Sequence, residues 1–92
     1  MAWEVDQRVQ GLKNATINLL NRAISQTQYS QSCVRTIDDR THVALGDGHA
    51  EGDRIIEDIA QSGDCLSKAQ ACLQTALDEA KRIDTMMWVP DE

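Results

Sequence analysis

The sequence is poor in the residues that build a thick hydrophobic core. It has no Phe, one Tyr, two Trp and one Pro among 92 residues. Aromatic residues and frequent turns are typical of β-sandwiches and barrels, so this composition disfavours both. Ala, Leu, Ile, Gln and Arg are mostly compatible with helices. A chain of this length buries roughly 60–65% of its unfolded surface, which predicts one domain, residues 1–92, with a thin core.

Long apolar runs are also missing. The apolar stretches, such as residues 86–89, are only a few residues long, whereas a membrane-spanning helix needs roughly 20. Residues 1–6 are acidic where a signal peptide carries positive charge, and no apolar segment follows them. We therefore expect no membrane span and no cleaved leader. The protein is expected to be cytoplasmic at synthesis, and any secretion would have to proceed without a cleaved signal peptide.

Positive charge is scarce and dispersed. Nine Lys and Arg stand against fifteen Asp and Glu, which leaves a net charge of −6. Lys81 and Arg82 are the only adjacent basic pair. Such a surface repels a polyanion over most of its area. Nucleic acid is therefore not an expected partner.

The three cysteines carry no metal-binding signature. Cys33, Cys65 and Cys72 lack the CxxC spacing of zinc sites, and an odd number cannot pair completely within one chain. Reduced thiols are the plain interpretation. A disulfide between Cys33 and Cys65 stays geometrically conceivable in an oxidising setting.

One cluster near the middle of the chain resembles a metal or acid–base site. His42 and His49 have four Asp residues nearby, but the spacing matches neither HExxH nor a calcium loop. The Gly46-Asp47-Gly48 segment is too short for a phosphate-binding loop, and it follows a helix rather than a strand. We expect no catalytic residue, no metal and no cofactor, and hence a protein that is not an enzyme.

Two long segments show the 3–4 spacing of amphipathic helices, and a period of two fits no segment. In the first segment the positions in register are Val5, Val9, Leu12, Thr16, Leu19, Ala23, Gln26, Ser30, Cys33 and Ile37. In the second they are Ile55, Ile59, Ser62, Leu66, Ala69, Leu73, Ala76, Ala80, Ile83 and Met87. The pattern predicts one helix over about 4–45 and another over about 53–87.

The segment between these helices is rich in glycine and predicts a turn over about 46–52. Gly46 is a candidate C-cap of the first helix, and Asp47 or Asp53 can cap the second. Gly63 could divide the second helix and make a three-helix protein. The apolar register continues through this point, which favours one helix with Gly63 on its outer face.

The predicted fold is all-α, an antiparallel two-helix hairpin in which facing residue numbers add up to about 95. This register places Leu12 and Leu19 between the helices. Ile17, Leu20 and Ile24 then form a second apolar stripe, predicted to bind a similar hairpin in a homodimeric or heterodimeric four-helix bundle. The alternative is that these three residues widen the core of the hairpin itself.

The predicted tail, residues 88–92, begins with a large aromatic residue. A helix must stop before Pro90, and the hairpin register places Trp88 opposite residue 7. Trp88 can therefore pack on Trp3 and Val5 at the open end, or project into a partner.

Two long helices, a mid-chain glycine turn, an acidic balance and a C-terminal tail together resemble the WXG100 (ESAT-6-like) superfamily of type VII secretion. The resemblance covers the whole chain in architecture. That family carries Trp-x-Gly at the turn, where this chain has Leu45-Gly46-Asp47-Gly48. Its export signal places an acid four residues after an aromatic, a spacing that Trp88 and Glu92 match. The resemblance implies a non-enzymatic subunit or targeting partner of a secreted protein; the alternative is a cytosolic helical adaptor or chaperone.

Overall fold

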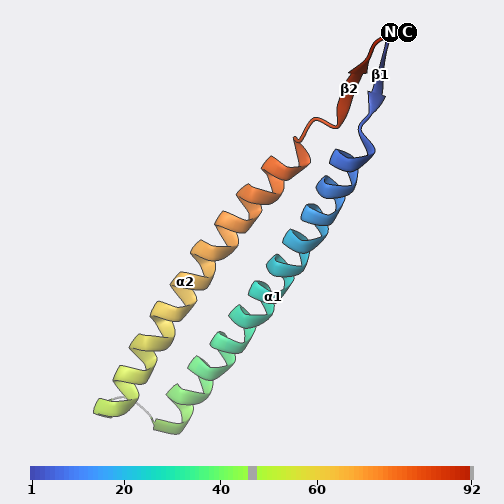
Figure 1. Cartoon of the computed structure of the whole chain (residues 1–92). Coiled ribbons are helices and arrows are strands. Elements are labelled where there is room, and N and C mark those ends of the chain that lie inside the picture. Colours follow the sequence, from blue (N-terminus) through green and yellow to red (C-terminus); the bar gives the residue numbers. More distant parts are fainter. Residues whose placement is uncertain (46–47, 92) are drawn as a thin grey trace.

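The computed structural model describes residues 1–45 and 48–91, which form two long helices and two short strands (Figure 1). In chain order the elements are β1 (Ala2–Val5), α1 (Gln7–Leu45), α2 (Ala50–Lys81) and β2 (Met86–Val89). α1 and α2 pack against each other in opposite directions. The predicted all-α helical hairpin is confirmed, although both helices differ from the predicted bounds at one or both ends.

α1 begins later than predicted because Asp6 caps it. The Oδ1 atom of Asp6 accepts the backbone N–H groups of Arg8, at 3.1 Å, and Val9, at 3.4 Å. This satisfies two of the N–H groups that a helix leaves free at its start. The residues before Asp6 are thereby released from the helix, and they form β1.

The start of α2 is capped by a residue that the sequence did not single out for this role. The Nδ1 atom of His49 accepts the backbone N–H of Gly52 at 3.1 Å. The expectation that Asp53 caps this helix is wrong, because Asp53 lies within the first turn. There the carboxylates of Glu51 and Asp53 interact favourably with the positive end of the helix dipole. Gly46 and Asp47 lie outside the described residues. Gly48 has a φ of 82°, a conformation in which glycine avoids the strain of a side chain.

α2 runs unbroken through Gly63, so the two-helix prediction is confirmed over the three-helix alternative. The expected outward position of Gly63 is wrong. A Cβ atom built on Gly63 would lie 3.8 Å from Cγ1 of Val34, so this glycine faces α1. A Cβ atom at this position would make an ordinary van der Waals contact, so there is room for it between the helices.

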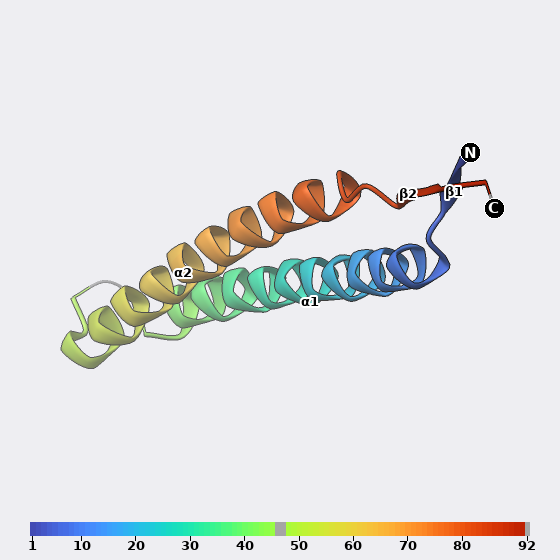
Figure 2. The same ribbon diagram turned by 45° about the horizontal axis from the view of Figure 1, so that its top comes forward.

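α2 ends at Lys81, earlier than predicted, and the chain then pairs with its own beginning. The backbone N–H of Arg82 donates to the carbonyl of Glu79 at 3.1 Å, and the N–H of Asp6 donates to the carbonyl of Thr85 at 2.6 Å. β1 and β2 form an antiparallel sheet in which Trp3 pairs with Trp88 and Val5 pairs with Met86. Figure 2 shows this sheet beyond the ends of the two helices.

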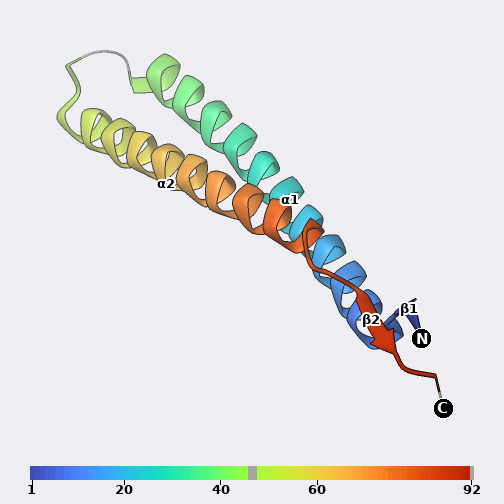
Figure 3. The same ribbon diagram turned by 90° about the horizontal axis from the view of Figure 1, so that it is seen from above.

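The molecule is a rod of 79 × 14 × 12 Å with a radius of gyration of 21.8 Å. Its elongated shape is also visible from above in Figure 3. A compact domain of this length has a radius of gyration of about 12 Å. Among the described residues the buried apolar side chains are Ile24, Leu77 and Ala80. The thin core expected from chain length is thus reduced to a single seam between two helices.

The seam does not use the predicted face of α1. Leu12 and Leu19 are 67% and 63% exposed, whereas Ile24 is only 8% exposed. The prediction that Leu12 and Leu19 face α2 is therefore wrong. Residues that face each other across the seam have numbers adding up to 96–98, as in the pairs Lys13–Ile83, Gln31–Ser67 and Val34–Gly63. The predicted alignment along the hairpin was close, and the error lies in the rotation of α1 about its axis.

Candidate protein-interaction surfaces

Polar residues occupy part of the seam, and their polar groups are bonded there. The Nζ atom of Lys13 donates to the carbonyl of Ile83 at 3.1 Å, just beyond the last turn of α2. Nearer the turn, the Nε2 atom of Gln31 donates to the Oγ atom of Ser67 at 3.2 Å. A lysine near the C-terminal end of a helix also interacts favourably with the helix dipole. These two exposed hydrogen bonds join α1 to the C-terminal end and to the middle of α2.

The predicted interface residues lie on this seam rather than on a free surface. Ile24 is buried, and Ile17 and Leu20 are half-buried. The expectation that Ile24 lies on an outward stripe is wrong. Ile24 lies where the alternative places it, in the core of the hairpin.

A different apolar stripe on α1 faces outward. Leu12 and Leu19 are seven residues apart and therefore share one side of the helix, and Ile37 lies on the same side more than half exposed. A shallow depression next to this stripe is lined by Tyr29, Ser32, Cys33, Thr36 and Ile37. Exposed apolar side chains therefore lie on this side of α1 toward both of its ends, with Gln26 and Ser30 between them.

One flank of α2 continues this stripe across the hairpin. Each helix turns by about 100° per residue, and Leu12 and Leu19 lie roughly a quarter turn before the centre of the seam. Because the helices are antiparallel, the corresponding flank of α2 faces the same way, and it contains Ile55 and Ala69. A second shallow depression is lined by residues of both helices, including Ile37, Ala44 and Ile55. We call this surface the helical apolar face and define it as Leu12, Leu19, Ile37, Ile55 and Ala69.

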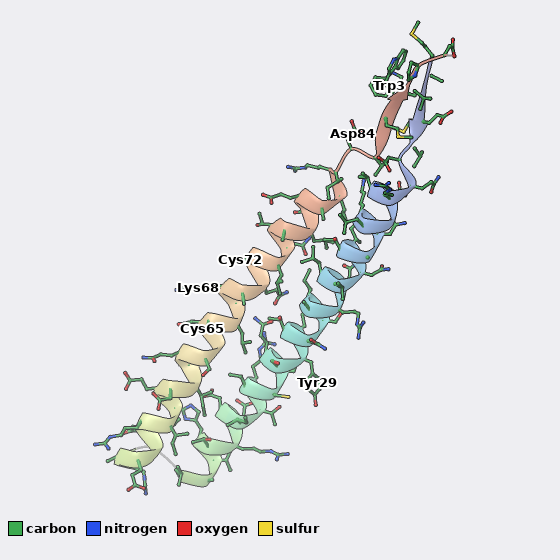
Figure 4. The ribbon with its side chains drawn as sticks, in the orientation of Figure 1. Trp3, Tyr29, Cys65, Lys68, Cys72 and Asp84 are labelled. Atoms are coloured by element: carbon green, nitrogen blue, oxygen red, sulfur yellow. The ribbon has the colours of Figure 1, made fainter. Side chains whose placement is uncertain are left out.

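The opposite side of the hairpin is polar. Its two shallow depressions are lined mainly by Gln31, Arg35, Ser67, Gln70 and Gln74. Figure 4 shows Cys65, Lys68 and Cys72 on the edge of α2 that points away from α1, with Tyr29 on the outer edge of α1. The hairpin therefore has one apolar face and one polar face.

The sheet at the open end carries a second apolar surface. Side chains alternate along a strand, so the pairs Trp3–Trp88 and Val5–Met86 lie on one side of the sheet. The two indole rings are 5.3 Å apart and meet edge to face at 67°, yet Trp3 and Trp88 stay 63% and 49% exposed. Figure 4 shows Trp3 at the far end of the molecule from the turn. We call these four residues the tip face.

Trp88 makes the contact within the chain that one of the two alternatives from the sequence expects. Trp88 packs on Trp3, as in the alternative that closes the open end, and its pairing partner is residue 3 rather than residue 7. The sequence predicts no strand at Trp3 or at Trp88, because the apolar–polar alternation of residues 2–5 is short. Glu92, the other residue of the predicted recognition element, lies outside the described residues.

The groups with potential for chemistry are separate and mostly exposed. Cys33, Cys65 and Cys72 are free thiols. His42 lies 3.6 Å from the carboxylate of Asp38, one turn away on the same helix. Within residues 1–45 and 48–91, no three or more His, Cys, Asp or Glu side chains are grouped so that they could hold a metal ion.

Comparisons with protein-family models, with curated proteins and with solved structures found no match to this chain. Across the described part of the chain, neither helix combines the length and the apolar composition needed to cross a membrane. The helical apolar face and the tip face are the surfaces of the described chain that are suited to binding another protein.

Proposed function

We propose that this chain is a non-enzymatic protein–protein interaction module whose helical apolar face binds a second helical hairpin. The observation that carries the proposal is the exposed area. The chain exposes 7,017 Å², whereas a compact protein of this mass exposes about 5,300 Å². The excess of about 1,700 Å² is roughly twice the 800 Å² that each partner buries in an interface of standard size.

The distribution of polarity supports a four-helix bundle. Bundles bury one apolar side of each hairpin and leave the other side to solvent. The helical apolar face supplies the first kind of surface, and the glutamine-rich opposite side supplies the second. Small residues such as Ala69 on the flank of α2 favour close approach of the partner's larger side chains. The partner in this arrangement is a second copy or a similar hairpin.

In its finer form, the proposal is a WXG-like subunit or targeting partner of a type VII secretion substrate. It is supported by the two-helix architecture, the mid-chain turn and the acidic balance. The alternative, a cytosolic helical adaptor or chaperone, is favoured by two observations. Cys65 and Cys72 are exposed free thiols, which suit a reducing compartment, and Trp88 is paired in a strand rather than free after a helix.

Solution mass tests the helical apolar face directly. The wild type should have a mass of about twice 10.2 kDa in sedimentation equilibrium, or should need a similar hairpin as partner. Replacing Leu12 and Leu19 together by Asp should abolish association while helix content is retained. The matched control replaces Asn14 and Asn21, which are exposed and have the same spacing, by Asp. A wild type that is monomeric at high concentration and binds no partner contradicts the proposal.

Co-purification from culture supernatant and from cell lysate separates the two finer forms. A type VII subunit should be found in the supernatant with its partner. A cytosolic adaptor should be found with its partner only in the lysate. Because the Leu12 and Leu19 double variant lacks the interface in both cases, it serves as the negative control for each sample.

A further inference from the structure

The tip face is unpartnered within the described chain. β1 and β2 lie beyond the helix ends (Figures 1 and 2), and each strand has only the other as a neighbour in the sheet. The outer edge of each strand therefore presents backbone N–H and C=O groups to solvent. A two-stranded sheet is marginal in water and is stabilised when a third strand is added or its apolar face is covered.

The area of the tip face indicates the size of its occupant. Aromatic side chains present roughly 150–250 Å² each, so the exposed parts of its four residues amount to on the order of 400 Å². This is about half of the 800 Å² per partner in a stable dimer of standard size. A second copy docked only at the tip is therefore disfavoured, whereas a short extended segment needs no larger surface.

The charge around the sheet indicates the chemistry of that segment. Residues 1–6 and 83–91 contain four carboxylates, on Glu4, Asp6, Asp84 and Asp91, and no Lys, Arg or His. Two copies meeting here would bring eight carboxylates and only the two Met1 ammonium groups together, which opposes self-association. The ammonium group at Met1 pairs with the carboxylate of Asp91. Glu4 is exposed, and it lies on the side of β1 opposite the tip face.

We propose that the free edge of β1 binds an extended segment of another protein in which apolar residues alternate with Lys or Arg. Alternation along the added strand places its apolar side chains on the tip face, next to Trp3 and Val5. Its basic side chains then fall on the other side, beside Glu4, as an opposite-charge cross-strand pair. This surface is separate from the helical apolar face, so the inference does not depend on the proposed four-helix bundle.

Intrinsic fluorescence provides a specific probe, because the two Trp residues of the chain are both in the sheet. The ligand used is a synthetic peptide of six alternating Lys and Val residues, titrated into the full-length protein. We expect a saturable blue shift of the emission. A peptide of the same composition with all Val before all Lys, and an alternating Glu and Val peptide, should each bind at least tenfold more weakly.

Two charge reversals on the protein complete the test. Glu4→Lys should weaken binding of the alternating peptide at least tenfold, whereas Glu57→Lys, an equal change on the exposed surface of α2, should change it less than twofold. Circular dichroism checks that both variants keep their helices. Equal binding of the alternating and blocked peptides, or equal loss in both variants, overturns the proposal. A blue shift that appears on raising the protein concentration without peptide also overturns it, because a second copy then covers the tip.

Discussion

Truncation of Leu77 is the most direct test of the seam. Leu77 is 4% exposed, the lowest value among the buried apolar side chains. Leu→Ala changes in cores cost about 2–5 kcal/mol, and the lower part of this range applies where the surroundings can close around the cavity. A seam between only two helices can close in this way, so we expect the free energy of unfolding to fall by about 2–3 kcal/mol. For a domain of this size that corresponds to a decrease in Tm of roughly 10–20 °C.

Leu19 supplies the matched control, because the same atoms are removed from an exposed site on the other helix. Leu19→Ala should change the free energy of unfolding by less than about 0.5 kcal/mol at micromolar concentration. Thermal and urea unfolding followed by circular dichroism measure both variants. The loss for Leu77→Ala should not depend on protein concentration, whereas any loss for Leu19→Ala should grow with concentration if the helical apolar face is an interface. If both variants lose the same free energy of unfolding at every protein concentration, then Leu19 is as buried between the helices as Leu77. That result would contradict the side of α1 that the structure places against α2.

Three further predictions concern the glycines, the cap of α2 and the sheet. Gly63→Ala should raise the free energy of unfolding by about 0.5–1 kcal/mol, because alanine favours a helix over glycine and its Cβ atom would make only an ordinary contact with Val34. Gly52→Ala should lower the free energy of unfolding in the same urea titration, since its Cβ atom would lie 3.0 Å from side-chain atoms of Leu45. His49→Ala should cost about 0.5–2 kcal/mol by loss of the cap, and His49→Asn should cost much less, which comparison of the two Tm values checks. Trp3→Ala should accelerate hydrogen exchange of the β2 amides and leave that of α2 unchanged; uniform acceleration in both elements would show that the sheet does not unfold locally.

The hairpin itself could be predicted because its signals are local. Two long runs with helical spacing and a glycine-rich segment between them define two helices whatever they contact. The continuity of α2 through Gly63 follows in the same way, since one glycine costs only about 1 kcal/mol and the register is unbroken on either side. The antiparallel alignment then depends only on the length of the turn.

The strands could not be predicted by the same means. Residues 2–5 and 86–89 are too short to show a reliable period, and their pairing joins the two ends of the chain. Helix patterning assigned Val5 and Met87 to helices because both fit the extended apolar register. Asp6, an effective cap, was the local signal that the first helix starts later.

The sequence by itself determined two amphipathic helices, their antiparallel order and the nearness of Trp3 to Trp88 at the open end. Only the tertiary structure decided which side of α1 contacts α2. α1 carries two apolar stripes, and the pattern of residues does not distinguish the stripe that is covered from the stripe that is free. The stripe that contains Ile24 is interrupted by Lys13 and Gln31, which form hydrogen bonds to Ile83, just after α2, and to Ser67 on α2. Such bonds join residues that are far apart in the chain, so they form only when the helices pack. For that physical reason, only the tertiary structure shows that the helical apolar face is the side of α1 left free.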